Sequence, residues 1–306
     1  MSQAQKVPET YQLTGDDVVS TIQRVRWQHL LKDSLKRLRV ADGFSHARAS
    51  AFALALLLVE ALIAVLGLAV AMGSSGFSKT VTDVLQTAVP GPAGQLLTSA
   101  ARQAQEAGSA NQYTALLIGL AASLITGTTA LGQFERSCNR IYGVEDDRPS
   151  ARKYGRAALL AVSVGVIASI GVTMLVLGRP IAVAFDGSWA GDVWVVARWP
   201  LAVALLILST TAMLRWSPNR RQPGYTWLIY GAAVSVLLTV GASIVLALFF
   251  RWSPTFGDTY GPLAGMIGLL LWCYAIAVAG LFGIAITAQL EQERVAGSSA
   301  GESSGA

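Results

Sequence analysis

Residues 225–250 read YTWLIYGAAVSVLLTVGASIVLALFF, a run without a charged side chain. A helix that rises about 1.5 Å per residue needs about 20 apolar residues to cross a hydrocarbon core about 30 Å thick. This run is long enough, so it predicts a transmembrane helix. Five further apolar runs are found, and the expected spans are Ala49 to Met72, Tyr113 to Phe134, Ala157 to Gly178, Val193 to Leu214, Tyr225 to Phe250 and Pro262 to Leu290.

The composition of the chain agrees with this prediction. Hydrophobic residues make up 53% of the 306 residues and charged residues only 13%, with a mean hydropathy of +0.50. Soluble domains contain about 25% charged residues. Membrane β-barrels have alternating segments of about 10 residues, whereas these runs are continuously apolar, which favours helices. We therefore predict an all-α polytopic membrane protein with six transmembrane helices.

Three regions are expected along the chain. Residues 1–48 form a polar cytoplasmic arm, residues 49–290 form the transmembrane domain, and residues 291–306 form a disordered cytoplasmic tail. The tail is predicted to be disordered because Gly, Ser and Ala dominate it from Ala296 onward.

Basic residues are distributed unevenly between the loops. Most of the 23 Lys and Arg residues lie before the first span, between spans two and three, or between spans four and five. Because loops rich in Lys and Arg stay on the cytoplasmic side, both termini are expected in the cytoplasm and the protein in the plasma (inner) membrane. The same bias accounts for the net charge of +5, so no nucleic-acid partner is expected.

The arm carries a helical pattern. Thr14 and Asp17 can form a capping box, and apolar residues then recur at nearly helical spacing, at Val18, Ile22, Val25, Leu31, Leu35 and Leu38. With basic residues on its other faces, this segment predicts a basic amphipathic helix on the anionic inner leaflet. The alternative is a helix packed on the cytoplasmic loops. On the outer side, two short surface helices are expected within residues 73–112, the second beginning at Pro92.

Two stretches carry recognisable motifs. Residues 132–156 read GQFERSCNRIYGVEDDRPSARKYGR and include Glu135 and Asn139. Residues 214–227 read LRWSPNRRQPGYTW, and the segments TYGPLAG and LLLWCYAIA follow; the motif positions there are Trp216, Pro223, Gly224, Tyr260, Gly261, Trp272 and Tyr274. Together these motifs resemble the YihY/BrkB family of inner-membrane proteins.

The resemblance implies six spans and a plasma-membrane location. It implies no agreed reaction, because the labels used within the family include both a virulence factor and a ribonuclease. The first span departs from the family pattern: the chain has Leu54-Ala55 and the segment VEAL at residues 59–62 where the family carries paired tyrosines and a Ser-x-x-Pro motif. Any function of those tyrosines and that proline is not expected here.

The chemistry needed for a nuclease is not visible. Metal-dependent hydrolysis requires several converging His, Asp, Glu or Cys ligands, but the chain has only two histidines, His29 and His46, both near the N-terminus. Cys138 and Cys273 lie at the end of one span and inside another, so no disulfide is expected. We predict no catalytic residue, no metal site, no cofactor and no enzymatic activity.

Candidate functional residues lie within and beside the spans. Glu60 is the one acidic residue deep in a span, where an ionisable group costs about 2.5 to 3.5 kcal/mol on insertion scales. It is either a proton- or substrate-coupling carboxylate or a protonated side chain satisfied in the bundle. Small and hydroxyl-bearing residues inside the spans favour tight helix packing; the alternative is a polar translocation path lined by Ser209, Thr210, Thr211, Tyr230 and Tyr274. The candidate contacts with anionic lipid on the inner face are Arg136, Arg140, Arg152, Lys153 and Arg156. These arginines and the lysine could also serve only to fix orientation.

Two classes of function remain open. The first is a transporter or flippase-like protein for an envelope lipid or another amphiphile. The second is a non-catalytic membrane scaffold or envelope-integrity protein. The expected partners are membrane lipids, anionic at the inner face, and a second copy of the chain or another membrane protein is also compatible with the sequence.

Overall fold

The computed structural model describes the whole chain except residues 1–4, 11, 72–81, 83–85, 87–88, 147, 185–188, 254–255, 257–258 and 304–306. All regular structure in the described residues is helical. The helices are α1 (Gly15–Arg24), α2 (Trp27–Val40), α3 (Gly43–Ala71), α5 (Pro92–Tyr142), α6 (Ser150–Ala184), α7 (Trp189–Trp216), α8 (Tyr225–Trp252) and α10 (Pro262–Ser303).

Six of these helices are long and apolar enough to cross a membrane, which confirms the predicted number of spans. The span-length segments are Gly43–Ala64, Leu116–Tyr142, Ser150–Gly171, Gly191–Trp216, Tyr225–Trp252 and Leu263–Gly297. Their exposed faces carry large apolar side chains, among them Leu117, Leu159, Val196 and Leu237. Such faces suit contact with lipid tails rather than with water.

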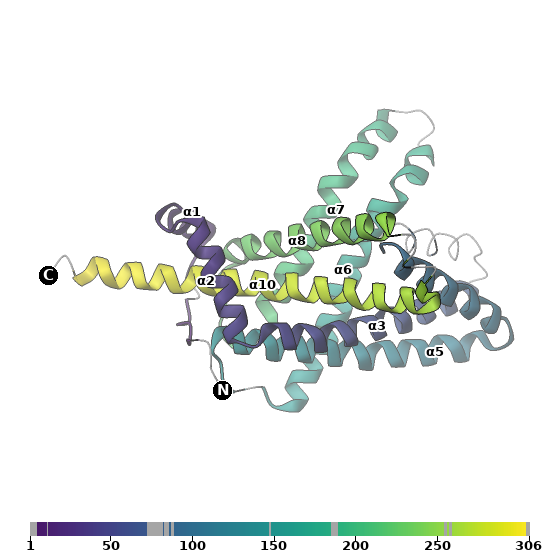
Figure 1. Ribbon diagram of the computed structural model, residues 1–306, viewed down its shortest axis with the longest axis horizontal. Helices are drawn as coiled ribbons and strands as arrows, with labels where there is room; N and C mark the ends of the chain where they lie inside the picture. The colour runs from purple at the N-terminus through teal and green to yellow at the C-terminus, as the bar shows by residue number, and fades with distance from the viewer. Residues whose placement is uncertain are drawn as a thin grey trace.

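The helices α3, α5, α8 and α10 run side by side along the long axis of the molecule (Figure 1). α10 packs against the other three, and α3 packs most extensively on α5. The hairpin of α6 and α7 crosses this group steeply and contacts α5 on one side and α8 on the other. We call the end of the bundle that carries α1, α2 and the loops 143–149 and 217–224 the basic end, and the opposite end the distal end.

Small residues allow α8 and α10 to approach closely. A Cβ atom added to Gly231 on α8 would lie only 2.7 Å from the carbonyl oxygen of Gly283 on α10. The hydroxyl groups of Ser235 and Thr287 donate to carbonyls of their own helices, at 3.0 and 2.6 Å. The small residues spaced four apart therefore serve tight helix packing here.

The structure corrects the prediction of two short outer helices. A helix begins at Pro92 as predicted, after Gly91 in a positive-φ conformation, but α5 continues from there to Tyr142 without a break. The first turns of α5 lie over the distal end of α10, where Leu96 would contact a Cβ atom at Gly265. No proline interrupts residues 93–142, so nothing local ends the helix. The first of the two predicted outer helices falls largely outside the described residues.

A second correction concerns the C-terminal tail. Residues 291–303, predicted as disordered, continue α10 as far as Ser303. The reason is that the first residues past the span contact the N-terminal arm: Arg294 forms an ion pair with Asp17 at 2.7 Å, and Arg24 donates to the carbonyl of Glu293 at 2.8 Å. These tertiary contacts stabilise helical turns that the composition alone does not favour.

The arm forms two helices instead of the one predicted. α1 ends at Arg24, Val25 is extended, and α2 begins at Trp27. The sequence is consistent with this break, because Leu31 follows Val25 by six positions, a step that leaves one helical face. The predicted capping box is confirmed, and the Thr14 N–H donates to Asp17 Oδ2 at 3.0 Å. Val18 of α1 and Leu30 of α2 pack in one apolar cluster with Trp227 and Leu228 of α8 and Leu290 of α10, so the arm packs on helices rather than on the loops of the alternative interpretation.

Candidate functional site

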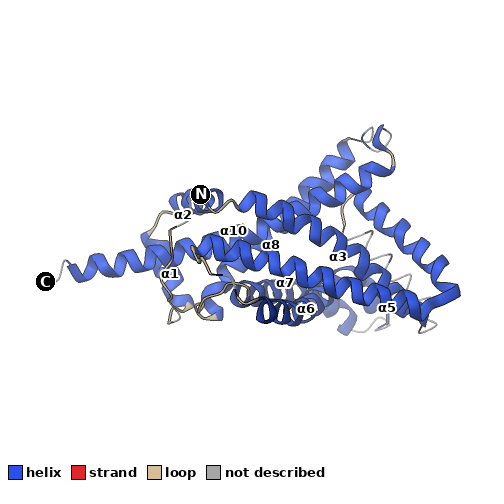
Figure 2. Cartoon of the chain, turned by 90° about the horizontal axis from the view of Figure 1, so that it is seen from below, coloured by secondary structure: helices blue, strands red, loops and turns tan. Residues whose placement is uncertain are grey.

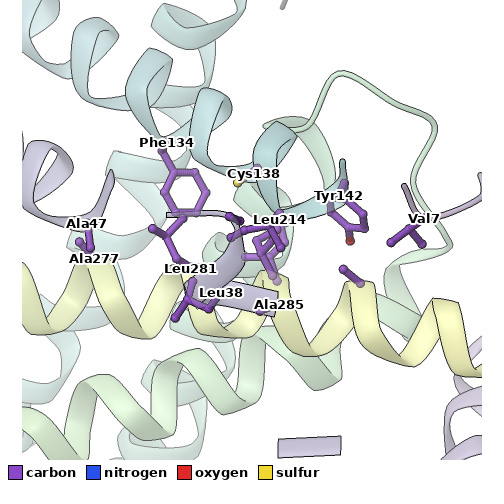
Figure 3. Packing of buried hydrophobic residues seen from close by; sticks show 14 of the residues in the cluster. Val7, Leu38, Ala47, Phe134, Cys138, Tyr142, Leu214, Ala277, Leu281 and Ala285 are labelled. Atoms are coloured by element: carbon purple, nitrogen blue, oxygen red, sulfur yellow. The ribbon is translucent and has the colours of Figure 1, made fainter. Parts of the chain in front are cut away.

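At the basic end, polar groups lie over a cluster of buried apolar side chains. Figure 3 shows Val7 from the N-terminal segment beside Tyr142 at the end of α5, with Cys138 and Leu214 nearby. All four side chains are buried. The segment before α1 therefore lies over the ends of the spans and closes the cluster.

A buried ion pair joins the parts of the chain that meet there. Arg220 Nη2 lies 2.8 Å from Glu291 Oε2, and these side chains are only 2% and 0% exposed. Thr10 Oγ1 donates to the same carboxylate oxygen at 2.6 Å. The Arg220 guanidinium also stacks 4.3 Å from the centre of the Tyr142 ring, a favourable cation–π position. The pair thus holds together the N-terminal segment, α5, the α7–α8 loop and α10.

A second group of charged and amide side chains joins α5 to the α7–α8 loop. Arg148 Nη1 lies 2.9 Å from Glu135 Oε1 and donates to the carbonyl of Ser217 at the same distance. The backbone N–H of Asn219 donates to Asn139 Oδ1 at 2.7 Å. Glu135 and Asn139 come from one of the two sequence motifs and residues 217–219 from the other. The structure therefore brings the two motifs into direct contact.

Arg37 on α2 is the third charged group buried at the basic end. Its Nε donates to Gln289 Oε1 at 3.2 Å, and its Nη1 donates to the carbonyl of Ile141 at 3.1 Å. Burial lowers the pKa of the Arg37 guanidinium from its usual range. A guanidinium still keeps its proton at neutral pH, so Arg37 is a buried cation that ties α2 to α5 and α10.

Residues 5–10, 12 and 13 run across the ends of the spans and are here named the N-terminal strap. The Val7 N–H donates to the carbonyl of Tyr142 at 3.1 Å, and the carbonyl of Pro8 accepts from Arg220 at 2.9 Å. At the other end of the strap, the Gly224 N–H donates to the carbonyl of Leu13 at 3.2 Å. The motif glycine Gly224 thus contacts the strap, while Trp216 remains partly exposed.

The other motif residues lie toward the distal end. Gly261 has a φ of 50° directly before α10, a conformation that favours glycine. The ring of Tyr260 packs 4.8 Å from that of Phe256. Trp272 Nε1 donates to Ser243 Oγ at 2.9 Å and so links α10 to α8. Gly261 therefore shapes the turn before α10, and Tyr260 and Trp272 make packing and hydrogen-bond contacts.

The structure does not bring Glu60, Tyr230 and Tyr274 together. Tyr230 is partly exposed on α8, which packs on α7 and α10. Tyr274 on α10 packs between two apolar clusters. Glu60 lies on α3, where its Oε2 atom is buried without a hydrogen-bond partner among the described residues.

The register of α3 against α5 places Glu60. A Cβ atom at Gly127 would lie 3.2 Å from Leu57, and one at Gly119 would lie 2.8 Å from the backbone nitrogen of Ala64. Because the helices are antiparallel, Glu60 lies between these contacts, level with Ser123. Glu60 therefore lies within the stretch of α3 that packs along α5.

The basic residues predicted to contact lipid differ in their positions. Arg136, Arg140, Arg152 and Arg156 are exposed. Lys153 is 5% exposed, and its Cε lies 3.6 Å from where a Cβ atom at Gly132 would be. Lys153 is therefore turned toward α5, unlike the four arginines.

A shallow hollow opens on the surface between α5 and α6. Its lining residues are Leu124, Ile125, Thr128, Thr129 and Tyr154. Ile125, Thr129, Gly132 and Arg136 follow one another at intervals of three or four residues, so they share one side of α5. Arg136 is exposed on this same side of α5, about two turns beyond the hollow toward the basic end.

The hydroxyl groups of three residues on α7 form hydrogen bonds within their own helix. Ser209 and Thr210 both donate to the carbonyl of Leu206, at 2.9 and 2.8 Å, and Thr211 donates to the carbonyl of Ile207 at 2.7 Å. These bonds satisfy the hydroxyl groups within their own helix.

Among the described residues, no group of three or more His, Cys, Asp or Glu side chains could hold a metal ion.

Comparison with known proteins supports the motif resemblance. The chain matches the virulence factor BrkB family over residues 34–306. It is 27% identical to the ribonuclease-like protein YfkH of Bacillus subtilis (strain 168) over 86% of this chain and 96% of that protein. It is also 27% identical to a UPF0761 membrane protein of Aromatoleum aromaticum over 68% of this chain, which spans half the length of that relative. No solved structure matches the chain.

Proposed function

The chain belongs to the virulence factor BrkB family of membrane proteins, and we propose that it binds an anionic amphiphile and moves it between the leaflets of the plasma membrane. The observation that supports this proposal is the shallow hollow between α5 and α6, together with the exposed Arg136 about two turns farther along the same side of α5. An acyl chain fits the apolar lining, and a phosphate-bearing headgroup fits the guanidinium group.

The charges at the basic end favour an anionic headgroup. Arg136 and Arg140 follow the hollow along α5 and are both exposed. Each basic residue near an anionic leaflet contributes about 1 kcal/mol of attraction. The same residues give the loop bias that predicts a cytoplasmic location for this end. We therefore propose that the headgroup enters from the cytoplasmic leaflet.

The arrangement of the α6–α7 hairpin supports movement as well as binding. Toward the basic end the hairpin is packed closely, since Gly132 on α5 abuts Tyr154 on α6 and Gly231 on α8 abuts Leu214 on α7. Gly155 and Gly165 on α6 and Gly241 on α8 would each accept a Cβ atom with no neighbour within 4 Å, so these faces of the two helices are open. Figure 1 shows the hairpin projecting away from the group of parallel helices, and we propose that this projecting part moves within the lipid.

A lipid-transfer assay tests the proposal. The protein is reconstituted into vesicles containing fluorescent phosphatidylglycerol, and dithionite reports the fraction of label that reaches the outer leaflet. We expect the wild type to accelerate this exchange. In the double variant Arg136→Gln, Arg140→Gln, the protein-dependent increase in the exchange rate should be at least tenfold smaller. Arg251→Gln, an exposed arginine at the distal end, serves as the matched control and should retain the full rate.

Two results would contradict the proposal in different ways. If the wild type binds phosphatidylglycerol in native mass spectrometry but does not accelerate exchange, the protein is better described as a non-catalytic membrane scaffold. If the double variant and the wild type exchange lipid equally fast, the hollow and its arginines are not the route.

A further inference from the structure

Helix α2 has an orientation unlike that of the spans. In Figure 1 it runs across α10 near the basic end, and in Figure 2, turned by 90°, it is seen nearly end-on beside α10. α10 is one of the candidate spans. A helix that crosses a span in this way lies approximately in the plane of the membrane.

The contacts of α2 show how it lies against the bundle. Leu30 packs with Trp227 and Leu290, and Leu38 packs with Phe134 and Leu281. Trp227 lies in the first turn of α8, whereas Phe134 and Leu281 lie two or more turns inside their helices. α2 therefore lies against the side of α10, with its Trp27 end nearest to the ends of the spans.

The two sides of α2 differ in chemistry. Leu30, Ser34, Arg37 and Leu38 are buried against the bundle. The side turned away from the bundle is exposed and carries three cations at helical spacing, Lys32, Lys36 and Arg39. No carboxylate among the described residues pairs with these three cations. At the start of the helix, Trp27 is 62% exposed and Leu31 follows one turn later, also exposed.

We infer that α2 is an interfacial helix that rests on the anionic leaflet, with Trp27 and Leu31 at the acyl boundary and Lys32, Lys36 and Arg39 among the headgroups. Tryptophan prefers the membrane interface, and each added cation strengthens attraction to an anionic surface about fivefold. α2 then gathers anionic lipid at the end of the bundle where Arg136 and Arg140 lie. The inference rests on the proposed function only for this last step.

Lipid-borne quenchers test the position of α2. A fluorescent thiol probe is attached to Leu31→Cys in the full-length protein, which is feasible because both native cysteines are buried. In vesicles containing phosphatidylglycerol, we expect quenching by brominated lipid and protection from iodide in the water. Gln23→Cys on α1, an exposed position, should show the opposite pattern.

A charge variant tests the choice of lipid. With brominated phosphatidylglycerol diluted into phosphatidylcholine, the probe at residue 31 should report enrichment of the anionic lipid. The triple variant Lys32→Gln, Lys36→Gln, Arg39→Gln should reduce this enrichment at least tenfold. Iodide quenching at residue 31 without lipid quenching would overturn the inference and leave α2 as a surface for a water-soluble acidic partner. The assay measures no lipid transfer, so it can succeed where the proposed transfer activity fails.

Discussion

The buried ion pair between Arg220 and Glu291 is predicted to hold the N-terminal strap closed. Glu291→Gln keeps the size of the side chain but leaves the Arg220 guanidinium, 2% exposed, without its counter-charge. Removing one partner of a buried pair costs about 3 to 5 kcal/mol. Arg220 retains its bond to the carbonyl of Pro8 and its position over the Tyr142 ring, so we expect the lower end of that range.

The two native cysteines make this cost measurable. Cys138 is fully buried in the cluster beneath Val7, whereas Cys273 is fully buried in a separate cluster. Local opening of the strap exposes only the first. A loss of about 3 kcal/mol in closing free energy corresponds to a roughly 100-fold faster reaction of Cys138 with a membrane-permeant maleimide. The rate at Cys273 should not change.

Two further variants separate the ion pair from general loosening. Glu293→Gln changes a partly exposed carboxylate one turn from Gln289 and should alter labelling of Cys138 less than tenfold. Arg220→Met combined with Glu291→Leu removes both charges and should restore much of the protection. An unchanged rate at Cys138 in Glu291→Gln, or an equal rise at both cysteines, would refute the reasoning.

Three further predictions follow from single contacts. Gly283→Val places a side chain about 2.5 Å from the carbonyl of Gly231, so it should destabilise the protein by about 1 to 3 kcal/mol, seen as a lower melting temperature in detergent. The backbone N–H of Thr14 and, to a smaller extent, Arg294 lower the pKa of Asp17. The contribution of the Asp17 carboxylate to the stability of the folded arm is therefore present at neutral pH and is lost as the pH falls through the lowered pKa. Proteolysis of the arm should accelerate at such acidic pH, and this acceleration should be smaller in Asp17→Asn. Glu60→Gln should fold normally. Loss of lipid exchange in this variant, with normal lipid binding, would support a coupling role for Glu60. Full exchange activity of the variant across pH would exclude that role.

The spans could be predicted because apolar length is a local property of the sequence. Each run carries its own length and composition, and no partner is needed to recognise it. The break between α1 and α2, where one helix was predicted, has a local signal in the sequence, because the six-residue step from Val25 to Leu31 leaves the helical face. The continuation of α10 past Leu290 could not be predicted from the local sequence, because it depends on contacts with an arm more than 250 residues earlier in the chain.

The buried charges at the basic end could not be predicted for a related reason. Arg220 and Glu291 each lie beside the end of a span, where charged residues are ordinarily solvated. Their burial depends on the strap that covers them, and no local pattern links residues so far apart in the chain. Lys153 is different, because Ala157 and Leu160 follow it at intervals of four and three residues and are both buried. Its helical phase shows that it points inward, although the composition of the loop suggests exposure.

The distribution of these contacts constrains how the α6–α7 hairpin could move. At the basic end, Arg148 binds both Glu135 on α5 and the carbonyl of Ser217 after α7, so the two ends of the hairpin are fixed to the bundle. Toward its other end, the hairpin projects away from the group of parallel helices (Figure 1). Separating the basic end would break several charge-assisted bonds, whereas moving the distal end exchanges lipid contacts for helix contacts. Any motion that carries an amphiphile along α5 should therefore pivot near Arg148, and Arg148→Lys, which cannot form the same fork of bonds, should impair exchange more than lipid binding.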